Sequence, residues 1–179
     1  MMRFLQDYDR RAAVRYAHRW AYGRNPAFYD YEHLGGDCTN FASQCIFAGC
    51  GIMNFTPTFG WYYIDANQKA PAWTGVPYLY NFLTRKTFSV GPTAVDSPLE
   101  DVLPGDIVQL SFQGNEFQHC PVVVSVGTPR TLENTLVAAH SYDADNRPLS
   151  SYEFRDIRFL HITGVIRPWP MPGREGAPI

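Results

Sequence analysis

The sequence predicts a single α+β domain, with helices in its first half and antiparallel strands in its second half. Apolar residues with helical spacing occur before residue 90, whereas strand-like alternation occurs after residue 105. This order differs from the alternating β–α–β pattern of parallel-sheet proteins. A hydrophobic content of 45% in 179 residues is enough for one substantial core.

Three helices are predicted in the first half. The first covers Asp9–Arg24, where alanines recur at every fourth position. The second covers residues 38–49, whose apolar stripe has the spacing i, i+3, i+4, i+7 and i+8, and Asp37 is its expected N-cap. A short third helix over Val76–Leu83 begins with Pro77, a residue favoured in the first turn.

Four strands are predicted in the second half. A Pro-Gly-Asp turn precedes the first strand, Ile107–Phe112. The next two strands, His119–Val126 and Leu132–Ser141, form a hairpin around a Gly-Thr-Pro-Arg turn. The last strand covers Leu160–Arg167 and follows a charged segment.

The domain is expected to cover residues 1–169, followed by a proline-rich tail at 170–179. The net charge of −2 and the lack of a basic run argue against nucleic-acid binding. No apolar run reaches the roughly 18 residues of a transmembrane helix. The first residues lack the layout of a signal peptide. We therefore expect a cytoplasmic monomer, or a cell-wall-associated protein if the N-terminus has been trimmed.

Cys38 is the first candidate for chemistry. It follows Gly35-Gly36-Asp37 and opens the second predicted helix, where free N–H groups and the helix dipole stabilise a thiolate. The negative charge of Asp37 works against that stabilisation. In the alternative interpretation, Cys38 is simply the first member of the buried stripe.

A cysteine nucleophile needs a histidine base, which in turn needs a group that orients it. The sequence has five histidines: His18, His33, His119, His140 and His161. If the hairpin turn is centred between Pro129 and Arg130, His119 and His140 lie directly opposite each other on one face. A bulge or a one-residue slip would separate them. We expect His18 to be solvated and His33 to be a loop residue, and His161 is a competing candidate.

Motifs along nearly the whole chain support a family resemblance. The strongest is the run Gly36-Asp37-Cys38-Thr39-Asn40-Phe41-Ala42-Ser43-Gln44, followed by Pro104-Gly105-Asp106, His119 and Ala139-His140-Ser141. These residues resemble the putative amidase domain family, a bacterial branch of the papain-like cell-wall hydrolases. The wider group includes the CHAP and NlpC-type peptidases. The resemblance covers about residues 10–167.

The resemblance implies a papain-like fold, in which the helix that carries the nucleophile packs on an antiparallel sheet. Carried over by position, Cys38 is the nucleophile, His119 the general base and His140 the residue that orients it, with Asp143 as a reserve. Cys120-Pro121 departs from the family pattern, and its proline makes this strand irregular or an edge strand.

The implied reaction is hydrolysis of an amide through a thioacyl intermediate, without a cofactor. The expected partner is a peptide or amide, with the peptidoglycan stem peptide as a candidate. Trp61, Tyr63 and Trp73 are candidate walls of a substrate groove, although ordinary core packing explains each of them equally well.

Three other functions are compatible with the residues. His119, Cys120 and His140 could bind a metal ion, although the spacing typical of zinc ligands is absent. A papain-like acyltransferase of the transglutaminase type would be favoured if Asp143 oriented the base. A binding domain that keeps the fold without catalysis is the third alternative.

Overall fold

The computed structural model describes residues 2–169 and has the predicted α+β architecture. Its seven strands form one antiparallel sheet in the order β1-β7-β3-β4-β5-β6, and β2 pairs separately with β7. The expected tail at 170–179 lies outside the described residues. Within residues 2–169, no helix has both the length and the apolar character needed to cross a bilayer.

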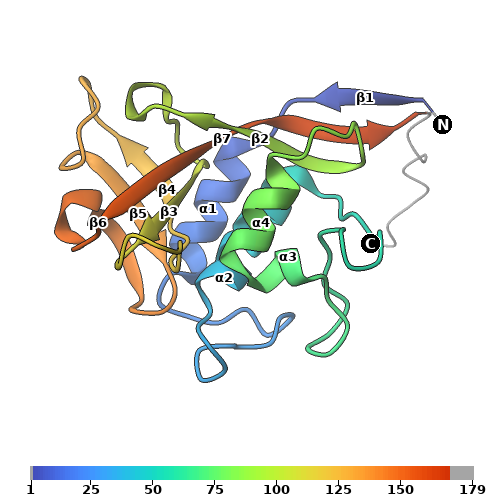
Figure 1. The fold of residues 1–179 in the computed structure, drawn as a ribbon, viewed down its shortest axis with the longest axis horizontal. Coiled ribbons are helices and arrows are strands. Elements are labelled where there is room, and N and C mark those ends of the chain that lie inside the picture. The colour runs from blue at the N-terminus through green and yellow to red at the C-terminus, as the bar shows by residue number, and fades with distance from the viewer. Residues whose placement is uncertain (1, 170–179) are drawn as a thin grey trace.

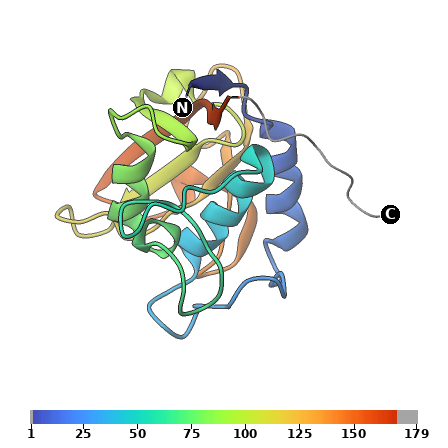
Figure 2. The ribbon, with the colours of Figure 1, turned by 90° about the vertical axis from the view of Figure 1, so that its right-hand side faces the viewer.

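The helices lie in the first half of the chain, as predicted. Their bounds are α1 Arg10–Trp20, α2 Cys38–Cys50, α3 Pro71–Thr74 and α4 Val76–Leu83. Figure 2 shows α2 between α1 on one side and the α3–α4 pair on the other. The side chain of Asp9 caps α1 by accepting the Ala12 N–H at 2.9 Å. The first helix is shorter than predicted, and α3 was not predicted.

The strands are β1 Arg3–Gln6, β2 Gly91–Ser97, β3 Ile107–Ser111, β4 Val122–Val126, β5 Thr135–Ala139, β6 Ala144–Pro148 and β7 Asp156–Pro168. Figure 1 shows β7 running across the molecule as the longest strand, with β1 and β2 beside its C-terminal part. β7 begins four residues earlier than predicted. Sequence reasoning missed β1, β2 and β6.

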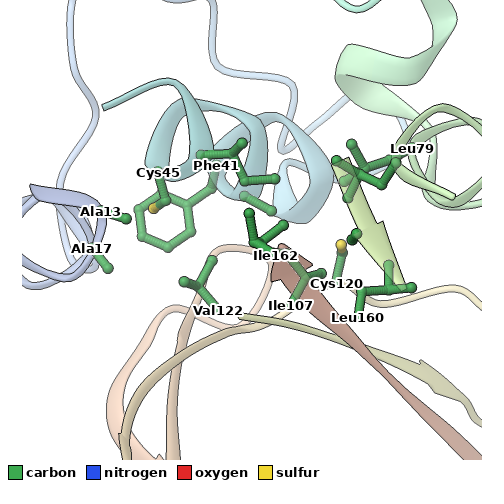
Figure 3. Packing of buried hydrophobic residues seen from close by; sticks show 14 of the residues in the cluster. Ala13, Ala17, Phe41, Cys45, Leu79, Ile107, Cys120, Val122, Leu160 and Ile162 are labelled. Carbon is green, nitrogen blue, oxygen red and sulfur yellow. The ribbon is translucent and has the colours of Figure 1, made fainter. Parts of the chain in front are cut away.

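The main core lies between the helices and one face of the sheet. In Figure 3, Ala13 and Ala17 of α1, Phe41 and Cys45 of α2 and Leu79 of α4 face the sheet residues Ile107, Val122, Leu160 and Ile162. Alternate strand residues point to the opposite face and form a smaller cluster, which includes Val108, Val123, Val137 and Phe159. The sheet thus fixes the position of the N-terminus of α2.

The predicted hairpin register is wrong by one residue. β4 begins at Val122, which pairs with Ala138, and Val123 pairs with Val137, so His119 does not oppose His140. Pro121, which has no N–H to donate, precedes the strand, and the register shifts again between Val123 and Ser125. A shift of one residue turns a side chain to the other face of a sheet. His119 instead forms an isolated bridge with Leu110 of β3.

The Pro-Gly-Asp turn is held by its aspartate. The buried Asp106 carboxylate accepts hydrogen bonds from Arg10 Nη1 at 2.6 Å and from His161 Nδ1 at 2.9 Å. It also accepts the backbone N–H groups of Leu103 and Ile162, at 2.8 and 2.9 Å. Asp106 therefore links α1, the turn and β7, and His161 is one of the residues bound to it.

Candidate active site

Cys38 is the first residue of α2 and its side chain is 7% exposed. Its Sγ lies 3.8 Å from the Thr39 hydroxyl and 3.9 Å from the carbonyl oxygen of Gln118. The side chain of Asp37 makes no capping hydrogen bond to α2, so the N–H groups of the first turn are not blocked by it. Burial raises the pKa of the Cys38 thiol, and the Thr39 hydroxyl lowers it in part.

His119 directly follows Gln118, whose carbonyl oxygen lies 3.9 Å from the Cys38 Sγ. Backbone hydrogen bonds with Leu110 hold it against β3, and the side chain is 5% exposed. Its ring packs between Phe112 and Tyr152, with centroid distances of 6.1 and 5.5 Å. Nε2 is buried without a hydrogen-bond partner among residues 2–169. Burial, and secondly the charge of Arg147, lower the pKa of His119 to about 4.

Cys38 and His119 open into one cavity of about 540 Å³. The glycine loop before α2 forms one wall, and residues of the β3–β4 connection form another. The remaining wall comes from the β5–β6 connection, from β6 and from the segment after it. The lining residues are Gly35, Gly36, Cys38, Phe112, Gln118, His119, Ser141, Tyr142, Arg147, Ser151, Tyr152 and Glu153. The cavity brings a thiol, an imidazole and a helix N-terminus together.

His140 is not joined to His119. Its Nδ1 lies 2.5 Å from Asp37 Oδ2, its Nε2 lies 2.8 Å from the Trp20 carbonyl oxygen, and its ring stacks on Phe41. Both ring nitrogens are therefore occupied by groups other than His119. The role predicted for His140, orienting the base, does not fit this geometry, because the register of β4 and β5 places the two histidines apart.

Asp37 is the centre of the network that His140 joins. The fully buried carboxylate also accepts the Tyr31 N–H at 2.9 Å and the Asn40 side-chain amide at 2.8 Å. The Asp37 N–H donates to the Ser141 hydroxyl at 2.8 Å. This network fixes the peptide that enters α2. The sequence indicates Asp37 as a helix cap. Its pairing with His140, 103 residues further along the chain, leaves no local pattern in the sequence.

The reserve candidate Asp143 is occupied elsewhere. Its carboxylate accepts two hydrogen bonds from Arg24, at 2.9 and 3.0 Å. Arg24 also lies within 4 Å of Asp30, Glu32 and Asp37, so it forms ion pairs with the acidic residues before α2. Asp143 is not among the residues that line the cavity. An acyltransferase would be favoured if Asp143 oriented the base, and this geometry does not place Asp143 in that role.

The candidate groove residues do not line the Cys38 cavity. Trp61 and Trp73 are fully buried, with ring centroids 4.9 Å apart. Their indole N–H groups donate to Ser43 Oγ at 3.0 Å and to Asn40 Oδ1 at 2.9 Å. Tyr63 is half-buried, packs on Phe28 and Trp73, and its hydroxyl accepts the Tyr29 N–H. The expectation of a groove is corrected: these bulky side chains form the core around α2.

The suggested metal ligands are not gathered at one point. Cys120 faces the main core, where its Sγ lies 3.7 Å from Gln109 Nε2, and His140 binds Asp37. Across residues 2–169, no group of three or more His, Cys, Asp or Glu side chains is arranged to hold a metal ion.

The burial of neutral His119 predicts acid-sensitive stability. The pKa of His119 is about 4 in the folded chain against an ordinary value of 6.5, so between these pH values only the unfolded chain takes up the proton. The free energy of unfolding should therefore fall by about 3 kcal/mol from this residue as the pH drops from 6.5 to 4.

Urea denaturation at several pH values would measure this loss in wild type and in His119→Gln. In His119→Gln, most of the fall in unfolding free energy between pH 6.5 and 4 should disappear. His33→Gln, at an exposed loop position, should show the same fall as wild type. The same pH dependence in all three proteins would contradict the burial of a neutral His119.

Comparisons with known proteins give a family match. The model of a family described as a putative amidase domain matches residues 7–163. An uncharacterized protein of Bacillus subtilis (strain 168), YhbB, is 32% identical over 144 residues, which are 79% of this chain. This chain covers 44% of the length of that relative. No solved structure matches significantly.

Proposed function

This chain belongs to the putative amidase domain family, and we propose that it hydrolyses amide bonds with Cys38 as nucleophile and His119 as proton acceptor and donor. Membership of the family supports the hydrolysis of amides. The cysteine mechanism rests on one observation: Cys38, at the start of α2, and His119 line the same cavity.

In the first half of the proposed reaction, the Cys38 thiol transfers its proton to the neutral imidazole of His119. The sulfur then attacks the amide carbonyl and forms a C–S bond. The negative oxygen accepts hydrogen bonds from N–H groups in the first turn of α2, which the Asp37 side chain leaves free. His119 returns its proton to the nitrogen as the C–N bond breaks, and the amine leaves.

In the second half, a water molecule attacks the thioester. His119 takes a proton from the water, the C–S bond breaks, and the sulfur takes the proton back from His119. The products are a carboxylic acid and the free thiol of Cys38. The reaction consumes only the amide and water, so it requires no cofactor.

In this proposal His140 supports the nucleophile rather than the base. Its bond to Asp37 fixes the residue directly before Cys38 and thereby the direction of the first turn of α2. Apo geometry often leaves catalytic hydrogen bonds unformed until the substrate binds, which is compatible with the unpaired Nε2 of His119.

The test is to trap the thioacyl intermediate. The protein is mixed with a panel of peptide amides and with purified peptidoglycan sacculi, since the sequence resemblance implies cell-wall peptides as substrates. Acid-quenched samples are analysed by intact-mass and peptide-mapping mass spectrometry. We expect an acyl adduct on Cys38 and hydrolysed amides.

Cys50→Ala is the matched control, because Cys50 lies buried at the opposite end of the same helix. This variant should form the adduct normally. An adduct on another cysteine, or hydrolysis that only a chelator abolishes, would contradict the proposed mechanism.

A further inference from the structure

Arg147 of β6 is a cation in the wall of the candidate active site. It lines the cavity that contains Cys38 and His119. Two arginines of the domain pair with carboxylates: Arg10 with Asp106, and Arg24 with Asp143. Within residues 2–169, Arg147 has no carboxylate oxygen within 4 Å.

The head group of Arg147 is nevertheless held in place. Nε donates to the Ser151 hydroxyl at 2.8 Å, and Nη2 donates to the Ser151 carbonyl oxygen at 3.1 Å. The guanidinium carbon lies 3.8 Å from the centroid of the Tyr152 ring, a cation–π arrangement. Nη1 makes no hydrogen bond within residues 2–169. The guanidinium is thus oriented in advance and retains free donors.

Tyr152 connects this cation to the proposed base. Its ring is 9% exposed and lies against Arg147 and against the His119 ring, whose centroid is 5.5 Å away. A group bound to Arg147 would therefore lie in the same cavity as an amide placed at Cys38 and His119. A planar guanidinium with free donors matches the geometry of a carboxylate better than that of a neutral amide.

We propose that Arg147 binds a free carboxylate of the substrate, so that the enzyme prefers anionic peptide amides over neutral ones. The inference rests on the function proposed above and specifies its substrate class. The carboxylate belongs either to an acidic side chain or to the C-terminus of the peptide, near the bond that is cleaved.

The charges around the cavity fit an anionic substrate. Glu153 is the one carboxylate among the lining residues; it is exposed to solvent and is not paired with Arg147. His119 is uncharged before the substrate binds, because burial and the charge of Arg147 lower its pKa. A bound carboxylate would offset that charge, bring the pKa of His119 back toward its ordinary value, and so make the imidazole a stronger base.

The experiment compares kcat/KM on matched peptides of equal length. One peptide has a single Glu and an amidated C-terminus, one has a free C-terminal carboxylate, one is neutral, and one has a single Lys. The wild type should prefer whichever anionic peptide places its carboxylate at Arg147 by about 10- to 100-fold over the neutral peptide, the range for a charged hydrogen-bonded pair. The comparison of the two anionic peptides identifies the source of the carboxylate.

Three variants test the role of Arg147. Arg147→Gln should remove the preference, Arg147→Lys should keep part of it, and Arg147→Glu should favour the Lys peptide. A gain on the Lys peptide cannot result from misfolding. Arg155→Gln removes the same charge from an exposed position outside the cavity and should leave the preference unchanged.

Two results would overturn the carboxylate site while leaving the proposed function intact. One is equal kcat/KM on all peptides by an enzyme that forms the Cys38 adduct. The other is an equal loss on anionic and neutral peptides in Arg147→Gln. An enzyme that forms no Cys38 adduct with any peptide would instead overturn the proposed function, and this site with it.

Discussion

Replacement of Cys38 by alanine is expected to lower kcat for amide hydrolysis by about 10⁴-fold or more, the loss typical when a nucleophile of a catalytic unit is removed. The reason is that no other thiol opens into the cavity: Cys45, Cys50 and Cys120 are buried in the core. Steady-state hydrolysis of the best peptide from the panel would measure the loss.

The same variant should also lose labelling by iodoacetamide at residue 38, and Cys50→Ala should retain both activity and labelling. Because Cys38 is 7% exposed and alanine is smaller, the fold should tolerate the change. Activity within tenfold of wild type in Cys38→Ala would exclude a thioacyl mechanism at this residue.

Replacement of His140 by alanine is expected to cost about 3–5 kcal/mol of unfolding free energy, the usual loss when one member of a buried polar pair is removed. Asp37 is fully buried and would lose its 2.5 Å partner, while Phe41 would lose the ring stacked on it. For a chain of this size the loss corresponds to a fall in Tm of about 10 °C. Urea denaturation and thermal melting followed by circular dichroism would measure it.

His18→Ala provides the control, since His18 also pairs with an aspartate, Asp145, but its side chain is 39% exposed. An exposed pair contributes about 0–1 kcal/mol, so this variant should melt near wild type. If His140→Ala abolished hydrolysis without loss of stability, His140 would act in the chemistry, as the sequence resemblance implies.

Local signals predicted α2, which carries Cys38, and α4. The glycine loop, Asp37 and the apolar stripe placed Cys38 at the start of α2, and Pro77 marked the start of α4. Both are properties of consecutive residues, which is why sequence reasoning found them. The placement of His119 in the same cavity as Cys38 needed the family resemblance, because 80 residues separate Cys38 from the Gln118 carbonyl that its Sγ contacts.

Features that depend on pairing between distant strands were not predictable from local patterns. β2 contains Gly, Pro and Asp, which are rare in strands, and it is a strand only because it pairs with β7. The register of β4 and β5 depends on Pro121 and on a bulge, and an error of one residue was enough to misplace His140. The aromatic residues expected in a groove pack around α2, since their large surfaces are stabilised most by burial.

The pairing of β1 with the end of β7 has a practical consequence for joining this domain to other polypeptides. Arg3 is the partner of Pro168, so the two ends of the described chain leave from the same edge of the sheet. In Figure 1 that edge lies at the right, whereas β6, which carries Arg147, lies at the left. A polypeptide joined before Arg3 or after Pro168 would therefore leave the domain on the side away from β6 and its Arg147.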